Sequence, residues 1–210
     1  MNKFDLSLYL VTDQSLSKGR SHEYIVEEAV KGGVTMVQLR EKDISSREFY
    51  ELAKALKLVL KPLNIPLIIN DRLDIALAVD ADGLHIGQSD LPYSIARKLL
   101  GKDKIIGLSV ETIEQAREVN NVDVDYIGLS PVFSTNTKLD INTPLELSGI
   151  KEIAGFTKHK TVAIGGINSL NAESVIASGA DGIAVVSAIV SQENPQEAAF
   201  NLKTIIRKAR

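Results

Sequence analysis

The sequence predicts an α/β protein that folds as one (β/α)₈ barrel, the TIM-barrel architecture. Short runs of Val, Ile and Leu alternate with longer amphipathic stretches eight times in 210 residues, about 26 residues per unit. The runs are almost continuously apolar, as expected for parallel strands with both faces covered. The connections are short, and no composition break separates a second unit. We therefore expect a single domain over residues 1–210.

The predicted strands are the apolar runs bounded by polar or glycine residues. They are expected at residues 6–11, at 34–39, in a run that ends at 69, and at 83–86, 105–108, 126–129, 162–164 and 182–186. A doubly wound open sheet is the alternative. It commonly uses fewer units and a Gly-x-Gly-x-x-Gly turn after its first strand, which this chain lacks. The count of eight therefore favours closure into a barrel.

The predicted helices have recognisable starts and stops. Ser21 is a candidate N-cap for the first helix, and Ser45 or Ser46 for the second. Apolar residues at helical spacing follow each cap, and glycines or prolines interrupt the pattern. Further helices are expected at 73–79, between 92 and 101, at 113–119, at 145–156, before 179, and from 195 onward.

Composition excludes several classes of protein. The net charge is −3, which does not suggest a nucleic-acid partner. The chain has no cysteine, so disulfides, thiolate metal sites and cysteine catalysis are excluded. No segment approaches the ~18 apolar residues of a membrane span, and the first residues do not resemble a signal peptide. We expect a cytoplasmic protein without a membrane partner.

In such a barrel the active site is built from the loops that follow the strands. Polar residues and glycines at these positions are therefore the candidates for function. They are Gln38, Arg40, Glu41, Lys42, Asn70, Asp71, Arg72, Gln88, Asp90, Ser109, Glu111, Thr135, Asn136, Thr137, Lys138, Gly165, Gly166 and Ser187.

Two carboxylates follow consecutive strands. Asp71 comes after the third strand and Asp90 after the fourth, and neighbouring strands lie roughly 4.8 Å apart. Two carboxylates completed by phosphate and water oxygens are typical of Mg²⁺. The alternative is that Asp71 pairs with Arg72 and that Asp90 caps the helix at Pro92. The matching positions on adjacent strands favour the metal.

Two groups of residues suit anions. Arg40 and Lys42 alternate at the end of the second strand and could bind a diphosphate, although a solvated charged loop is the alternative. Gly165 and Gly166 after the seventh strand, with Ser187 after the eighth, suit a phosphate, although glycines there can be required by the turn alone. The long 130–144 loop adds further donors.

The histidines indicate no catalytic constellation. His85 lies within the fourth strand and is expected to be a packed, hydrogen-bonded residue. No Ser-His-Asp or Cys-His arrangement is present, which argues against nucleophilic hydrolysis. No lysine lies in the middle of a predicted strand, which argues against a Schiff-base aldolase.

Several segments together resemble the thiamine phosphate synthase (thiamine-phosphate pyrophosphorylase) family. The similar segments run in order from the second strand to the eighth: VQLREK at 37–42, INDR at 69–72, ADGLHIGQSDLP at 81–92, IGLS at 106–109, PVFSTNTK at 131–138, VAIGGI at 162–167 and GADGIAVVSAI at 179–189. A match of this extent is far more specific than any single motif.

The resemblance implies a transferase that couples 4-amino-5-hydroxymethyl-2-methylpyrimidine diphosphate to 4-methyl-5-(2-phosphooxyethyl)thiazole. It implies that Asp71 and Asp90 hold Mg²⁺ and that Arg40, Lys42, Ser109 and Lys138 take part in catalysis. The implied substrate-binding residues are Gln38, Leu39, Arg40, Glu41, Lys42, Asn70, Ser109, Thr135, Asn136, Thr137, Lys138, Gly166, Val186 and Ser187.

The chain also departs from the family pattern. Many members carry a histidine where this chain has Glu111, which affects the expected pyrimidine side of the site. Two alternatives remain: a thiazole tautomerase, which needs no metal, and a non-catalytic barrel that binds a phosphorylated ligand. Retention of Asp71, Asp90 and Lys138 argues against both. A homo-oligomer is compatible with the sequence.

Overall fold

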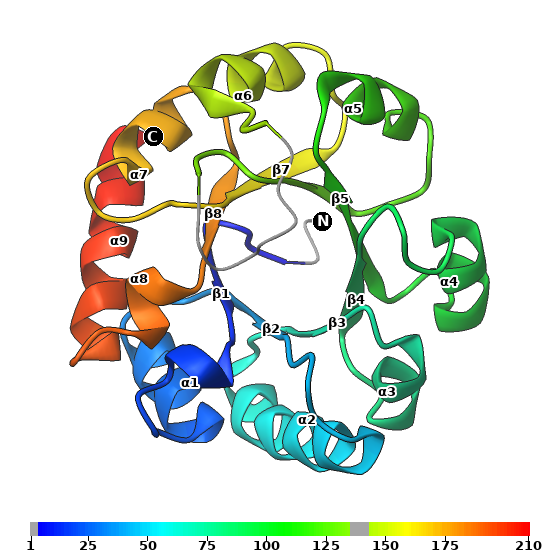
Figure 1. Cartoon of the computed structure of the whole chain (residues 1–210), viewed down its shortest axis with the longest axis vertical. Coiled ribbons are helices and arrows are strands. Elements are labelled where there is room, and N and C mark those ends of the chain that lie inside the picture. The colour runs from blue at the N-terminus through cyan, green and yellow to red at the C-terminus, as the bar shows by residue number, and fades with distance from the viewer. Residues whose placement is uncertain (1–3, 135–142) are drawn as a thin grey trace.

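A computed structural model describes residues 4–134 and 143–210. Within them, eight parallel strands close into a barrel in chain order, with β8 pairing back to β1 (Figure 1). The strands are β1 (Leu8–Val11), β2 (Met36–Leu39), β3 (Leu67–Asn70), β4 (Gly83–Ile86), β5 (Ile105–Val110), β6 (Tyr126–Leu129), β7 (Lys160–Ile164) and β8 (Gly182–Val185). The predicted (β/α)₈ barrel is confirmed.

The helices surround the barrel on its outside (Figure 1). They are α1 (His22–Lys31), α2 (Ser46–Leu60), α3 (Leu73–Ala78), α4 (Tyr93–Leu100), α5 (Ile113–Val119), α6 (Glu146–Ala154), α7 (Ala172–Ala177), α8 (Ser187–Val190) and α9 (Pro195–Ala209). The short α8 was not expected from the sequence. No helix in the described part of the chain is long and apolar enough to cross a membrane.

Side-chain caps explain where the long helices begin. The Ser21 side chain accepts a hydrogen bond from the Tyr24 backbone N–H at the start of α1. Ser45 and Glu48 form a reciprocal capping box at the start of α2. Asn194 caps α9, whose first residue is a proline. These caps satisfy backbone donors that a helix start otherwise leaves unpaired.

The strands divide the core into two parts. Residues that point outward pack against the helices, and Leu8, Leu10, Val37 and Leu39 belong to this outer core. Residues that point inward fill the barrel, as Tyr9 does. Because side chains alternate along a strand, Gln38 points inward while its neighbours in β2 point outward.

Around the amino-terminal end of the barrel, four side chains occupy equivalent positions and make the same kind of hydrogen bond. Each lies just before an even-numbered strand and accepts a hydrogen bond from a backbone N–H at the beginning of the preceding odd-numbered strand. The pairs are Thr35 with Leu8 at 3.1 Å, Asp82 with Leu67 at 2.9 Å, Asp125 with Ile106 at 2.9 Å, and Asp181 with Thr161 at 2.8 Å. These bonds fasten each odd strand to its even neighbour.

One strand boundary changes the interpretation of the site. Ser109 was expected to follow the fifth strand, but it lies inside β5, which continues to Val110. The pairing with β6 explains the extension, because Ser109 lies opposite Gly128 and Val110 opposite Leu129. Ser109 is therefore held by the sheet and not by a loop.

Candidate active site

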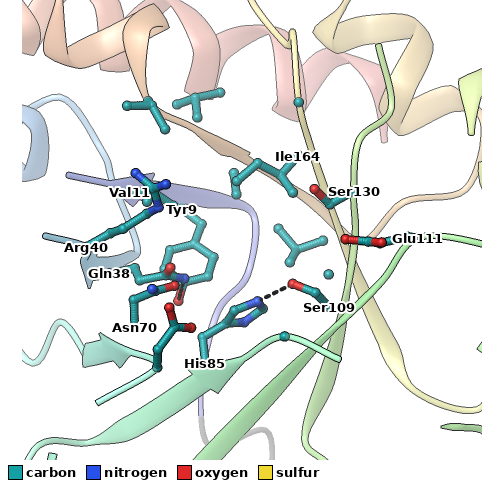
Figure 2. A pocket seen from close by; sticks show the side chains of 18 of the residues that line it. Tyr9, Val11, Gln38, Arg40, Asn70, His85, Ser109, Glu111, Ser130 and Ile164 are labelled. Carbon is teal, nitrogen blue, oxygen red and sulfur yellow. Dashed lines mark hydrogen bonds between the residues drawn. The ribbon is translucent and has the colours of Figure 1, made fainter. Parts of the chain in front are cut away.

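A cavity of about 510 Å³ opens at the carboxyl ends of the strands. Residues of all eight strand ends or their following loops surround it, and Figure 2 shows side chains from several strands pointing into it. It brings together most of the described candidates: Gln38, Arg40, Lys42, Asn70, Asp71, Gln88, Asp90, Ser109, Glu111, Gly165, Gly166, Val186 and Ser187. Thr135, Asn136, Thr137 and Lys138 lie outside the described residues.

The side chains of Leu39 and Glu41, two residues that the resemblance implies for substrate binding, point away from the cavity. The Leu39 side chain is fully buried in the outer core, because it points to the opposite face of β2 from Gln38. The Glu41 carboxylate turns towards α1. It lies 2.6 Å from His22 Nε2, and it accepts a hydrogen bond from the Gln14 backbone N–H at 3.2 Å. Neither side chain lines the cavity.

Asp71 and Asp90 lie side by side at the ends of β3 and β4, and their carboxyl groups are within hydrogen-bonding reach of each other. Asp71 has a left-handed backbone, and its N–H donates to the His85 carbonyl at 2.8 Å. The Asp90 Oδ2 atom accepts a hydrogen bond from the Gly87 N–H at 2.6 Å. Backbone bonds thus hold both aspartates at the cavity wall.

The alternative roles considered for these aspartates do not occur. Arg72 pairs with Asp74, with 2.6 Å between Nη2 and Oδ2, instead of Asp71. The N-cap of α4 is Pro92, and no side chain caps that helix. Both carboxylates are therefore left facing the cavity.

The electrostatics of the pair fit a cation. Burial, together with the neighbouring Asp90, raises the pKa of Asp71 to about 6, although Lys42 and Asn70 act in the opposite direction. No group of three or more His, Cys, Asp or Glu side chains with metal-binding geometry exists among residues 4–134 and 143–210. The protein thus offers two carboxylates, which suits an ion such as Mg²⁺ whose other ligands are substrate phosphates and water.

Arg40 and Lys42 form the cationic wall of the cavity. The Arg40 backbone N–H donates to Thr12 Oγ1 at 3.0 Å, and its guanidinium lies 3.5 Å from Asp13. Lys42 lies close enough to Asp71 to stabilise its ionised form. Because Glu41 points away between them, the two cations face the same space. This arrangement can bind a diphosphate.

A glycine turn forms another part of the wall. Gly165 and Gly166 have φ values of +105° and +65°, and a Cβ atom on Gly166 would lie 2.8 Å from the Ser134 carbonyl oxygen. Only glycine fits there without strain. Val186 and Ser187, at the start of α8, line the cavity with this turn. Closely approachable backbone N–H groups and a hydroxyl are suited to a phosphate.

Sequence reasoning missed several cavity residues. Tyr9 and Ser130 also line the cavity, and so does His85, which was expected only to be packed. The hydrogen bonding expected of His85 is present, with Tyr126 and Ser109 each at 2.9 Å. In the structure Leu84 and Ile86 belong to the outer core, so His85 between them points inward.

Residues 8–189 match the family model described as "Thiamine monophosphate synthase". The chain belongs to this family. It is 55% identical over 201 residues to the "Thiamine-phosphate synthase" of Syntrophomonas wolfei, covering 96% of each chain, and 52% identical over 198 residues to that of Clostridium novyi, covering 94% of this chain and 97% of the relative.

A solved structure of the family has the same fold. The structure titled "Thiamine phosphate pyrophosphorylase from Pyrococcus furiosus" superposes with a TM-score of 0.89 at 38% identity, covering 99% of this chain and 98% of the other. The predicted family and the predicted enzyme class, a transferase of thiamine biosynthesis, are confirmed.

Proposed function

We propose that the chain couples 4-amino-5-hydroxymethyl-2-methylpyrimidine diphosphate with 4-methyl-5-(2-phosphooxyethyl)thiazole, releasing diphosphate and forming thiamine phosphate. The observation that carries this proposal is the division of the cavity wall. A carboxylate pair and two cations lie at the ends of β2, β3 and β4, while a glycine turn and Ser187 follow β7 and β8. One region suits a metal-bound diphosphate and the other suits a phosphate.

The proposed reaction is a dissociative alkyl transfer. The C–O bond to diphosphate breaks first, leaving a pyrimidine methylene cation that the ring amino group stabilises, and the thiazole nitrogen lone pair then forms the new C–N bond. Arg40 and Lys42 bind the departing diphosphate and offset its growing charge. Mg²⁺, held by Asp71 and Asp90, would supply further charge neutralisation there. No general base is required, because the attacking nitrogen carries no proton.

The remaining assignments divide between the two substrates. Gln38, Asn70 and Ser109 are proposed to bind the pyrimidine, and Lys138 to bind the leaving group together with the two cations. The thiazole phosphate is assigned to Thr135, Asn136, Thr137, Gly166, Val186 and Ser187. Gly166, Val186 and Ser187 line the described cavity, whereas Lys138 and the three residues at 135–137 belong to the part of the chain that the structure does not describe.

One assay tests the proposal. Purified protein is mixed with both substrates and Mg²⁺, and thiamine phosphate is measured by chromatography. Product formation that requires both substrates and is lost with EDTA is expected. Interconversion of thiazole phosphate isomers without the pyrimidine would instead indicate a tautomerase. Binding of either phosphate compound with no chemistry would indicate a non-catalytic barrel.

A cytoplasmic location stays a prediction. A homo-oligomer is compatible with the sequence, and size-exclusion chromatography with light scattering measures the oligomeric state directly.

A further inference from the structure

Five side chains form a continuous hydrogen-bonded chain across the inside of the barrel. Gln38 Nε2 lies 2.9 Å from the Tyr9 hydroxyl, which lies 3.0 Å from the Tyr126 hydroxyl. The Tyr126 hydroxyl lies 2.9 Å from His85 Nδ1, and His85 Nε2 lies 2.9 Å from Ser109 Oγ. This hydrogen-bonded chain of side chains joins β2, β1, β6, β4 and β5. Figure 2 shows its last bond, between His85 and Ser109.

Packing holds the middle of this chain in place. Tyr9 and Tyr126 are buried, and their rings meet edge to face with centroids 6.0 Å apart. The His85 ring stacks on Tyr126 with centroids 5.5 Å apart. Burial raises the pKa of both phenols, so each tyrosine keeps its hydrogen at neutral pH. Every phenol therefore has one hydrogen to donate.

The number of hydrogens gives the chain a direction. Gln38 donates from Nε2, so Tyr9 accepts and must direct its own hydrogen to Tyr126. Tyr126 then donates to His85 Nδ1. A neutral imidazole carries its single hydrogen on the other nitrogen, so His85 donates from Nε2 to Ser109. Ser109 accepts this bond, and its own hydrogen stays available for a ligand in the cavity.

Both ends of the chain reach the cavity wall. With Nε2 bound to Tyr9, Gln38 presents its amide oxygen, which accepts no hydrogen bond from any residue within 4–134 and 143–210. Ser109 presents a hydroxyl hydrogen on β5. The two ends are thus an acceptor and a donor. If the amide of Gln38 were rotated, every hydrogen bond of this network would reverse. Ser109 would then donate to His85 and would offer the ligand an acceptor instead of a donor.

We propose that Tyr9, Tyr126 and His85 are positioning residues that preset Gln38 as an acceptor and Ser109 as a donor, and thereby select an aminopyrimidine over an oxopyrimidine. This inference rests on the proposed function and deepens it. A 4-aminopyrimidine offers an amino N–H to Gln38 and an unprotonated ring nitrogen to Ser109. A 4-oxo ring offers a carbonyl and a ring N–H instead, so it meets like groups at both ends.

The first experiment uses the free protein and does not depend on catalysis. Long-range ¹H–¹⁵N correlation NMR reports which imidazole nitrogen carries the hydrogen, and the chain has only three histidines to assign. The signals that disappear from the spectrum of the His85→Asn variant are those of His85. We expect His85 to carry its hydrogen on Nε2. A hydrogen on Nδ1, or on both nitrogens at neutral pH, would overturn the proposal even if the enzyme makes thiamine phosphate.

The second experiment measures selectivity. The ratio of kcat/KM for the 4-amino pyrimidine diphosphate to that for its 4-oxo analogue should be on the order of 10² or more in the natural protein. Tyr126→Phe removes the central hydroxyl and should lower this ratio about tenfold. The KM for the thiazole phosphate should not change. Tyr50→Phe, on α2 outside the barrel, is the matched control and should keep the full ratio.

The outcomes separate a positioning role from a structural one. If Tyr126→Phe lowers turnover of both pyrimidines equally, the hydroxyl supports folding alone and the proposal fails. If Tyr126→Phe does not fold, Tyr9→Phe replaces it, because that substitution interrupts the hydrogen-bonded chain beside Gln38. If the natural protein makes no thiamine phosphate, the proposed function fails. In that case the NMR result still decides the proposal about the positioning residues. The affinities for the two pyrimidine diphosphates, measured by calorimetry, then replace the kcat/KM ratio.

Discussion

At the scale of single residues, the defining feature is a pair of carboxylates that the fold leaves without a cationic partner in hydrogen-bonding contact among the described residues. Asp71 is drawn towards its neutral form by burial and by Asp90 beside it. A protein that keeps two like charges in contact gives up stability there. Mg²⁺ bound between Asp71 and Asp90 would remove this cost, because a divalent ion neutralises both carboxylates.

The first prediction concerns activity. Asp71→Asn and Asp90→Asn should each lower kcat/KM for thiamine phosphate formation about 10²- to 10⁴-fold, because leaving-group charge is no longer neutralised. Asp74→Asn is the control, since Asp74 pairs with Arg72 outside the cavity. Steady-state kinetics at saturating Mg²⁺ measures the effect. Full Mg²⁺-dependent activity in both cavity variants would show that the metal assignment is wrong.

The second prediction concerns stability against pH in metal-free buffer. The folded-state pKa of Asp71, about 6, lies above its ordinary value of 3.8. The stability that Asp71 contributes to the fold is therefore fully present below pH 3.8 and is lost as the pH rises through 6. Asp71→Asn avoids this loss, so at pH 8 in EDTA it should be more stable than the natural protein by about 1–2 kcal/mol.

Thermal unfolding at pH 5 and pH 8 measures the difference. It should shrink at pH 5, where most of Asp71 is protonated in the folded protein, and it should reverse when Mg²⁺ is added at pH 8 and stabilises only the natural protein. An Asn variant that is less stable than the natural protein at pH 8 in EDTA would contradict this account.

At the scale of elements, the segment that follows β2 presents Arg40 and Lys42 to the cavity because Glu41 is held on the other side. Its carboxylate lies 2.6 Å from Nε2 of His22, the first residue of α1, and both side chains are largely buried at 9% exposure. The bond from the Gln14 N–H adds a second attachment. Glu41 thus fixes the segment from which Arg40 and Lys42 face the cavity.

The third prediction tests this attachment. Glu41→Gln should weaken the contact with His22 and raise the KM for the pyrimidine diphosphate about tenfold, because both cations lose their fixed placement. The KM for the thiazole phosphate should stay the same. Glu27→Gln, at an exposed position of α1, is the matched control. An equal rise in both KM values would point to general loosening of the barrel instead.

At the scale of the whole molecule, the two ends of the barrel have separate tasks. The carboxyl ends of the strands hold the cavity, while the amino-terminal end carries the four repeated side-chain bonds to odd-numbered strands. Asp125 shows the pattern most completely. It accepts from the Ile106 N–H at 2.9 Å and from Arg97 at 2.6 Å. These bonds join neighbouring strands, and none of the four side chains lines the cavity.

The fourth prediction separates the two ends. Asp125→Ala should lower the free energy of unfolding by about 1–3 kcal/mol, because it leaves the Ile106 N–H without its acceptor and removes the ion pair with Arg97. Its kcat and KM values should match those of the natural protein. Asp123→Ala is a close control, since that carboxylate lies 3.5 Å from Arg97 but is 82% exposed, and it should change stability by less than about 0.5 kcal/mol. Urea unfolding and steady-state assays test both variants.

The sequence by itself determined the strands, every helix except α8, the closed barrel and much of the cavity wall. Eight apolar runs separated by capped amphipathic helices have few arrangements open to them, and parallel strands bring their carboxyl ends to one place. Asp71 and Asp90 could therefore be paired from their positions alone. The family resemblance, carried by segments in order along the chain, identified the enzyme class.

Only the tertiary structure decided which way each side chain points. Strands of a parallel barrel are buried on both faces, so they lack the alternation of polar and apolar residues that would reveal their phase. The outward direction of the Leu39 side chain was not predicted for this reason, and His85 was not recognised as a cavity residue. The contact between Tyr9 and Tyr126 joins residues 117 positions apart in the chain. It exists because closure of the sheet brings strands that are distant in sequence to face each other across the interior.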